Sequence, residues 1–138
     1  MDNDKPYLDY QHHLISIMRI NLAKLTADES TQTEGLPEDL IAKLDYIYNT
    51  QIIDEGFYDN GQQIICRLIS GFPQLTPQIP RPLLWFFGGD CLHYMPDEEI
   101  KLYQQLEEAR ILASQNKKQF DFAEAYQLLS QQFNQQRG

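Results

Sequence analysis

Basic residues, cysteines and long apolar runs are all scarce in this sequence of 138 residues. Only 11 lysines and arginines stand against 20 acids, a net charge of −9, so direct binding to a phosphate backbone is disfavoured. Two cysteines cannot hold together a small secreted domain, and the acidic start "MDNDKPYLDY" lacks the positive charge of a secretory signal. No apolar run approaches the roughly 18 residues of a membrane span. We therefore expect a reduced, soluble, cytoplasmic protein.

Motifs that carry chemistry are also missing. The sequence has no phosphate-binding glycine loop, no dinucleotide fingerprint and no Gly-x-Ser-x-Gly elbow. It has no Glu-x-x-His motif, whereas di-iron helical bundles use two. The acidic stretch "DEGFYDN" (54–60) lacks the ligand spacing of a calcium loop. We therefore predict no cofactor.

What the sequence does contain is enough apolar and aromatic material for a core. Hydrophobic residues make up 42% of the chain, with eight Tyr, seven Phe and one Trp, and aromatic side chains bury the most area per residue. The length favours one domain, residues 1–138. The acidic excess lies in residues 1–100, which hold 16 acids and 6 bases. Such an excess ordinarily serves solubility, but it also suits a basic partner.

Helical spacing of apolar residues recurs along the chain. In residues 7–26, Leu8, Ile15, Met18 and Leu22 share one stripe, and the same three-four spacing continues in later segments. Five long helices are predicted at 7–26, 36–54, 58–71, 96–115 and 121–133, with a short one from Pro82. No alternating pattern is long enough for a sheet. The sequence thus predicts an all-α, single-domain bundle of five or six helices.

Two connectors separate these helices. Residues 27–35, "ADESTQTEG", are polar, and we expect a mobile loop there. Residues 72–82, "FPQLTPQIPRP", carry four of the seven prolines, which predicts an extended connector because proline disrupts helix interiors. The chain ends, residues 1–5 and 134–138, are expected to fray.

The stretch "WFFGGDCLHYMPDEEI" (85–100) is the least ordinary part of the sequence. Trp85, Phe86 and Phe87 are too large to remain in water together, and two glycines can reverse the chain after them. This pattern favours a helix–glycine–helix corner that builds the core.

The same stretch admits a chemical interpretation. Asp90 and His93 are three apart, so on a helical turn they face the same way. A carboxylate and an imidazole at this spacing can share a metal ion or form an acid–base pair. Cys91 is adjacent, and His12 is a further candidate ligand. The spacing alone supports a metal site only weakly, because zinc sites usually have a second close pair of ligands.

The function that these features favour is non-enzymatic: a helical adaptor or regulator that binds an unidentified protein and forms a homodimer. The predicted contacts are Trp85, Phe86 and Phe87 as anchors, Asp90 and His93 at the rim, and Tyr7 and Tyr10 as secondary candidates. One alternative is a metal-binding or acid–base enzyme centred on Asp90, Cys91 and His93. Another is an acidic regulator that mimics nucleic acid toward a basic partner.

Overall fold

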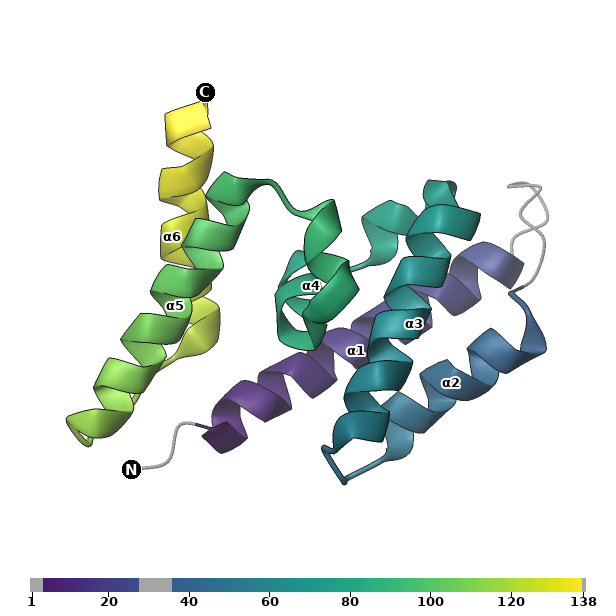
Figure 1. The fold of residues 1–138 in the computed structure, drawn as a ribbon, viewed down its shortest axis with the longest axis horizontal. Coiled ribbons are helices and arrows are strands. Elements are labelled where there is room, and N and C mark those ends of the chain that lie inside the picture. The colour runs from purple at the N-terminus through teal and green to yellow at the C-terminus, as the bar shows by residue number, and fades with distance from the viewer. Residues whose placement is uncertain (1–3, 28–35, 138) are drawn as a thin grey trace. The chain divides into compact units, whose positions relative to one another are not determined.

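The computed structural model describes residues 4–27 and 36–137, and every regular element in them is helical. The predicted all-α class is therefore confirmed. Six of the described elements are α-helices and two are 3-10 helices (Figure 1), so the predicted count of five or six is not confirmed. The extra elements are short 3-10 turns, and their eclipsed side chains leave no 3.6-residue pattern in the sequence.

Several predicted irregular segments can be placed only in part. The polar loop at 27–35 lies outside the described residues except for Ala27, which ends α1 (Asp4–Ala27). Of the ends expected to fray, residues 1–3 and 138 are likewise outside. Asp4 and Lys5 belong to α1, and residues 134–137 belong to α6 (Phe122–Arg137).

The chain divides into two compact units, and the larger one spans His12–Leu92. Its long central helix is α3, which contacts α2, α4 and the 3-10 helix η2. The unit contains most of α1, followed by α2 (Glu38–Asn49), α3 (Glu55–Gly71), η2 (Pro73–Gln78), α4 (Arg81–Phe87) and the first part of the 3-10 helix η3 (Gly89–Tyr94).

The helical stripes read from the sequence form the buried positions of this unit. Ile15, Met18 and Leu22 of α1 are almost fully buried. The predicted faces of the next two helices are buried as well: Leu40, Leu44 and Ile47 in α2, and Ile64, Ile65 and Leu68 in α3. Each such side chain stabilises the fold by about 1.5–3 kcal/mol relative to exposure.

The junction between α2 and α3 differs from the prediction. α2 ends at Asn49 rather than near residue 54, and α3 begins at Glu55 rather than near residue 58. The reason is a helix cap that lies before the predicted start of α3. The side chain of Asp54 accepts a hydrogen bond from the backbone N–H of Phe57 at 3.0 Å, which starts the helix there.

The proline-rich connector is not extended, contrary to the prediction. Residues 73–78 form the 3-10 helix η2. Pro73 stands at the start of this helix, where a backbone N–H has no partner within the helix, so the missing N–H of proline costs nothing. Short i→i+3 bonds hold its two ends: Leu75 N–H donates to Phe72 O at 2.8 Å, and Ile79 N–H to Thr76 O at 3.0 Å. Leu75 and Ile79 are buried as a result.

The second unit comprises residues 1–11 and 93–138. Here α5 (Asp97–Gln115) and α6 lie side by side and antiparallel (Figure 1). Tyr103 of α5 is buried, and its ring stacks on that of Tyr126 at 5.8 Å between centroids. Asp121 caps α6, since its side chain accepts a hydrogen bond from the backbone N–H of Glu124 at 3.1 Å.

Membrane-spanning capacity can be judged helix by helix. Within residues 4–27 and 36–137, none of the helices combines the length and the apolar character that crossing a bilayer requires.

Candidate interaction surface

The predicted glycine corner is confirmed at the end of α4. That helix ends at Phe87, and Gly88 and Gly89 follow with φ angles of 64° and 57°. Side chains other than glycine rarely adopt this left-handed conformation. The glycines therefore let the chain leave α4 and enter η3 at once, as the sequence predicts.

The three aromatic residues of this corner have different surroundings. Phe87 is buried against α3: a Cβ built on Gly61 would come within 2.1 Å of the Phe87 ring. Trp85 and Phe86 are only partly buried. Phe86 joins a cluster with Phe57, at 6.0 Å, and Tyr58, at 5.4 Å between ring centroids. Phe87 is thus a core residue and is not exposed to a partner, which corrects its predicted role as an anchor.

The predicted chemical group, Asp90, Cys91 and His93, lies along η3. Asp90 and His93 are exposed, whereas Cys91 is fully buried. Burial raises the pKa of the Cys91 thiol to about 12, and Cys66 and Asp90 add to the rise. A thiol with this pKa stays protonated at neutral pH, so Cys91 is unsuited to attack a substrate as a resident thiolate or to bind a metal as a thiolate ligand. In the part of the chain that the structure describes, no three His, Cys, Asp or Glu side chains form a group that could hold a metal.

Tyr7 and Tyr10 belong to the second unit and pack on Phe122, with ring centroids at 5.0 and 5.3 Å. Tyr7 is buried, and the guanidinium of Arg110 lies 4.4 Å from its ring centroid. Burial raises the pKa of Tyr10, and nearby Tyr126 and Asp121 add to this. These contacts hold the start of α1 on α6, so Tyr7 is mainly structural and Tyr10 is left half-exposed.

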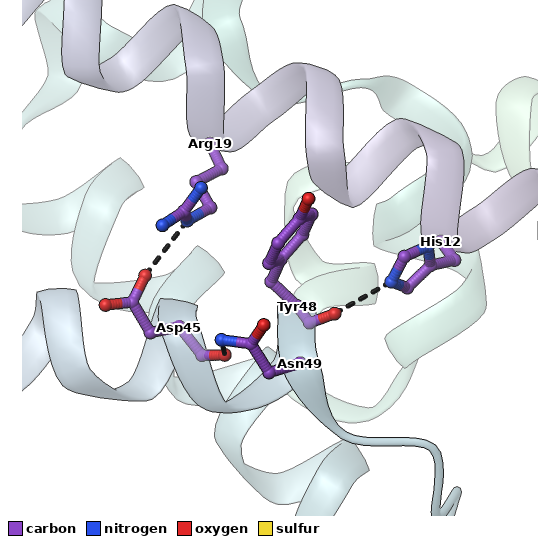
Figure 2. Close-up of polar contacts among 5 residues, drawn as sticks. All are labelled: His12, Arg19, Asp45, Tyr48 and Asn49. Atoms are coloured by element: carbon purple, nitrogen blue, oxygen red, sulfur yellow. Dashed lines mark hydrogen bonds and ion pairs between the residues drawn. The ribbon is translucent and has the colours of Figure 1, made fainter.

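His12, the fourth candidate ligand, contacts α2 instead of η3 (Figure 2). Its Nε2 lies 2.7 Å from the backbone O of Tyr48. Because a carbonyl oxygen only accepts, His12 donates from Nε2, and that nitrogen is not available to a metal. The imidazole also stacks on the Tyr48 ring at 5.5 Å.

The other face of the Tyr48 ring is covered by Arg19, whose guanidinium carbon lies 4.6 Å from the ring centroid. The same guanidinium donates to Asp45 at 2.9 Å (Figure 2). Tyr48 is therefore held between two α1 side chains that are seven residues apart. The contacts of His12 and Arg19 with Tyr48 fix the register of α1 against α2.

A groove with a volume of about 430 Å³ lies beside Arg19 and Asp45, toward the end of α1. It is mostly apolar, and Ile20 and Ile41 on its walls are 49% and 43% exposed. Its polar lining includes the paired Arg19 and Asp45. The apolar lining is Ile20, Leu22, Ala23, Leu36, Ile41 and Leu44.

The turn between α2 and α3 presents the most exposed large apolar side chain described. Ile52 is 67% exposed and its neighbour Ile53 is 39% exposed. Tyr46, 42% exposed, reaches the start of α3, with its hydroxyl 3.7 Å from where a Cβ on Gly56 would stand. We call these three residues, Tyr46, Ile52 and Ile53, the isoleucine corner.

Hydrogen bonds hold the isoleucine corner in place. The backbone N–H of Ile52 donates to Thr50 Oγ1 at 3.2 Å, and the N–H of Thr50 donates to Tyr46 O at 2.9 Å. Asp54, Glu55 and Asp59 follow directly and are exposed. An apolar patch is therefore presented on a fixed turn with carboxylates at its edge.

Sequence reasoning missed this corner because Ile52 fits the helical spacing of α2 and was read as part of that helix. A signal was available in "QIIDEG" (51–56): the acids and glycine that follow the two isoleucines are typical of a turn.

These features describe an all-α protein whose larger unit presents an apolar corner and an apolar groove. A family model described as PA2817-like matches residues 3–138. The chain therefore belongs to the PA2817-like family. Neither the comparison with curated proteins nor that with solved structures gives a match.

Proposed function

We propose that this protein is a non-enzymatic adaptor or regulator that binds another protein through the isoleucine corner. The observation that carries the proposal is the exposure of Ile52 and Ile53, at 67% and 39%, on a hydrogen-bonded turn beside Tyr46. Covering apolar area of this kind contributes about 25 cal/mol per Å² removed from water. Aromatic and aliphatic anchors surrounded by polar groups are typical of the energetic centre of an interface.

The rigidity of the turn supports the same function. The two hydrogen bonds at Thr50 fix the backbone that carries Ile52, and the Asp54 cap fixes the start of α3. A surface ordered before binding loses less conformational entropy in the complex. The isoleucines are thus presented in a form that a partner can bind directly.

The exposed carboxylates that follow the isoleucines favour a basic partner. Asp54, Glu55 and Asp59 are exposed beside the isoleucines, and the whole chain carries a net charge of −9. A partner segment that combines apolar side chains with lysine or arginine matches both features. Charge attraction accelerates the encounter, and apolar contact supplies the specificity that charge alone lacks.

A homodimer through this corner is disfavoured, because it would bring the same carboxylates together. We propose instead that self-association, where it occurs, uses the partly exposed Trp85 and Phe86 of α4, with Asp90 and His93 at the rim. A cytoplasmic location, in which both cysteines stay reduced, belongs to the same proposal. Light scattering on the native protein and on Trp85→Ala tests it: a dimer that the substitution dissociates is expected.

The two alternative functions, an enzyme centred on η3 and an acidic nucleic-acid mimic, would depend on other residues than the isoleucines. In an enzyme centred on Asp90, Cys91 and His93, Cys91 would not take part as a thiolate, because burial raises the pKa of that thiol to about 12. A nucleic-acid mimic would bind through charge alone, so its affinity would not depend on the isoleucines. Whether binding depends on the isoleucine corner therefore distinguishes the proposed adaptor or regulator from a nucleic-acid mimic.

Binding to designed peptides tests the proposal. The probe is a fluorescein-labelled helical peptide of leucine and lysine, compared with a leucine–glutamate peptide and a lysine–serine peptide of equal length. We expect the leucine–lysine peptide to bind most tightly in fluorescence polarisation. The double variant Ile52→Ser/Ile53→Ser should weaken this binding about tenfold or more, since each isoleucine contributes on the order of 1 kcal/mol when covered.

The matched control is Ile41→Ser, which removes a comparably exposed isoleucine from the groove and should leave binding unchanged. Glu55→Lys/Asp59→Lys should also weaken binding, more at low salt than at high salt. The proposal fails if the lysine–serine peptide binds as tightly as the leucine–lysine peptide. It fails equally if the serine double variant binds like the native protein.

A further inference from the structure

The two cysteines of the sequence lie against each other in the larger unit. Cys66 is on α3 and Cys91 on η3, and both are free thiols. Cys91 Sγ lies 4.0 Å from the backbone O of Gln62, the residue one helical turn before Cys66. Gln62 and Cys66 lie on the same face of α3, and a helical side chain leans over the turn that precedes it, so the Cys66 side chain lies near the same carbonyl. Cys66 also adds to the rise in the pKa of Cys91, as a close neighbour does.

The segment that carries Cys91 is held firmly to α3. The side-chain amide of Gln62 donates to Phe87 O at 2.8 Å. The same amide packs against Gly89 so closely that a Cβ there would come within 2.8 Å of Gln62 Nε2. Cys91 is fixed two residues beyond this contact, so its sulfur is held against the turn of α3 that precedes Cys66.

We propose that Cys66 and Cys91 form an oxidation site, at which a hydroperoxide converts the two thiols into an intramolecular disulfide. The inference stands on the position of Cys91 Sγ against α3, one turn before Cys66, and is independent of the proposed binding function. Its consequence is a covalent link between α3 and η3. This link fixes the glycine corner at Gly88–Gly89 on the helix that it packs against.

The chemistry balances with hydrogen peroxide as the oxidant. The thiolate of Cys66 attacks one peroxide oxygen, the O–O bond breaks, and the leaving hydroxide takes up a proton to form water. Cys66 is then a sulfenic acid. The sulfur of Cys91 attacks that of Cys66, the S–O bond breaks, and the departing hydroxide combines with the proton of Cys91. Two thiols and one peroxide thus give one disulfide and two waters.

The surroundings of the two sulfurs assign the order of these steps. Cys66 is partly exposed, so peroxide can reach it, whereas Cys91 is fully buried. Reaction at a cysteine follows access and thiolate character. Cys66 is therefore the thiol that is oxidised first, and Cys91 is the thiol that resolves it before further oxidation occurs.

The test is mass spectrometry of the full-length folded protein treated with hydrogen peroxide and then blocked with an alkylating agent. We expect the loss of two hydrogen atoms, a linked peptide pair that contains Cys66 and Cys91, and reversal by dithiothreitol. The disulfide closes the loop between the two positions, so the thermal midpoint of the oxidised protein should rise by roughly 10 °C.

Cys66→Ser provides the control, since it changes the partly exposed sulfur and leaves the buried one. In this variant peroxide should leave Cys91 unmodified, and the rise in thermal midpoint should be lost. The inference is overturned if native Cys66 accumulates sulfinic or sulfonic acid, or if the disulfide joins two chains. A linked pair that lowers the thermal midpoint would also contradict it, because the sulfurs would then not be positioned for bonding.

Discussion

Gly61→Ala should destabilise the protein, although alanine is the better helix former. Gly61 is a buried residue within α3. In an unobstructed helix the change would stabilise the fold by about 0.5–1 kcal/mol. Here the new Cβ would lie 2.1 Å from one carbon of the Phe87 ring, and 2.3 and 2.5 Å from two others. Carbon atoms in good contact are about 3.5–4.0 Å apart, so the ring must retreat by well over an ångström.

The cost of this overpacking decides whether Gly61→Ala stabilises or destabilises the fold. Phe87 is 3% exposed, and forcing extra volume into a packed core costs about 1–3 kcal/mol, occasionally more. Because three ring atoms clash at once, we expect the upper end of this range. Subtracting the helix-propensity gain leaves a net loss of about 2 kcal/mol, which lowers the thermal midpoint by roughly 7 °C in a domain of this size.

Thermal and urea denaturation followed by circular dichroism measure this loss. Gly71→Ala is the matched control: it changes the last residue of the same helix, where a Cβ would meet nothing within 4 Å, and should alter stability by less than about 1 kcal/mol. Phe87→Leu should partly rescue Gly61→Ala, with a coupling of about 1 kcal/mol. A Gly61→Ala protein that melts at or above the native temperature would refute the packing of α4 on α3.

Three further changes test other parts of the structure by the same denaturation assays. Tyr48→Leu should cost about 1 kcal/mol, because it removes the ring that two α1 side chains flank, whereas Tyr48→Phe keeps the ring and should be nearly neutral. Asp121→Ala should cost about 1 kcal/mol by removing the cap of α6, and Asp121→Asn should retain it. The hydrogen bond from Arg67 lowers the pKa of Asp39, so this pair stabilises the fold above the unfolded pKa, and the effect is lost as the pH falls through the lower folded value. Arg67→Met should therefore be less stable than the native protein at neutral pH, but no longer so once Asp39 is protonated.

Helix positions and buried faces were the most predictable features of this fold. The burial of Leu40, Leu44 and Ile47 follows directly from their spacing, because a helix presents such residues on one face. The glycine corner was predictable for a similar reason, since Gly88 and Gly89 follow an aromatic turn that must end. In both cases a local rule determines the structure.

Features that depend on contacts between distant segments were not predictable. Phe87 was expected to contact a partner, yet it fills the space that Gly61 leaves on α3, 26 positions earlier in the chain. His12 was considered as a ligand for the η3 group, yet it donates to Tyr48 O. Neither pairing leaves a periodic signal, because each depends on how whole helices pack.

The isoleucine corner was missed for a different reason. Ile52 continues the apolar spacing of α2, but the backbone at Thr50 is extended, with ψ of 142°, so the helix has ended before Ile52. The Asp54 cap then starts α3 after the two isoleucines, which leaves them on the turn between the helices. Single local contacts of this kind are difficult to rank from sequence, since Asp59 and Asn60 offer competing caps nearby.

Methyl NMR of isoleucine-labelled protein, titrated with the leucine–lysine peptide, tests the binding proposal most directly. We predict that the signals of Ile52 and Ile53 shift together and saturate, while those of Ile20 and Ile41 in the groove stay in place. Shifts confined to Ile20 and Ile41, or no shift at any isoleucine, would contradict it.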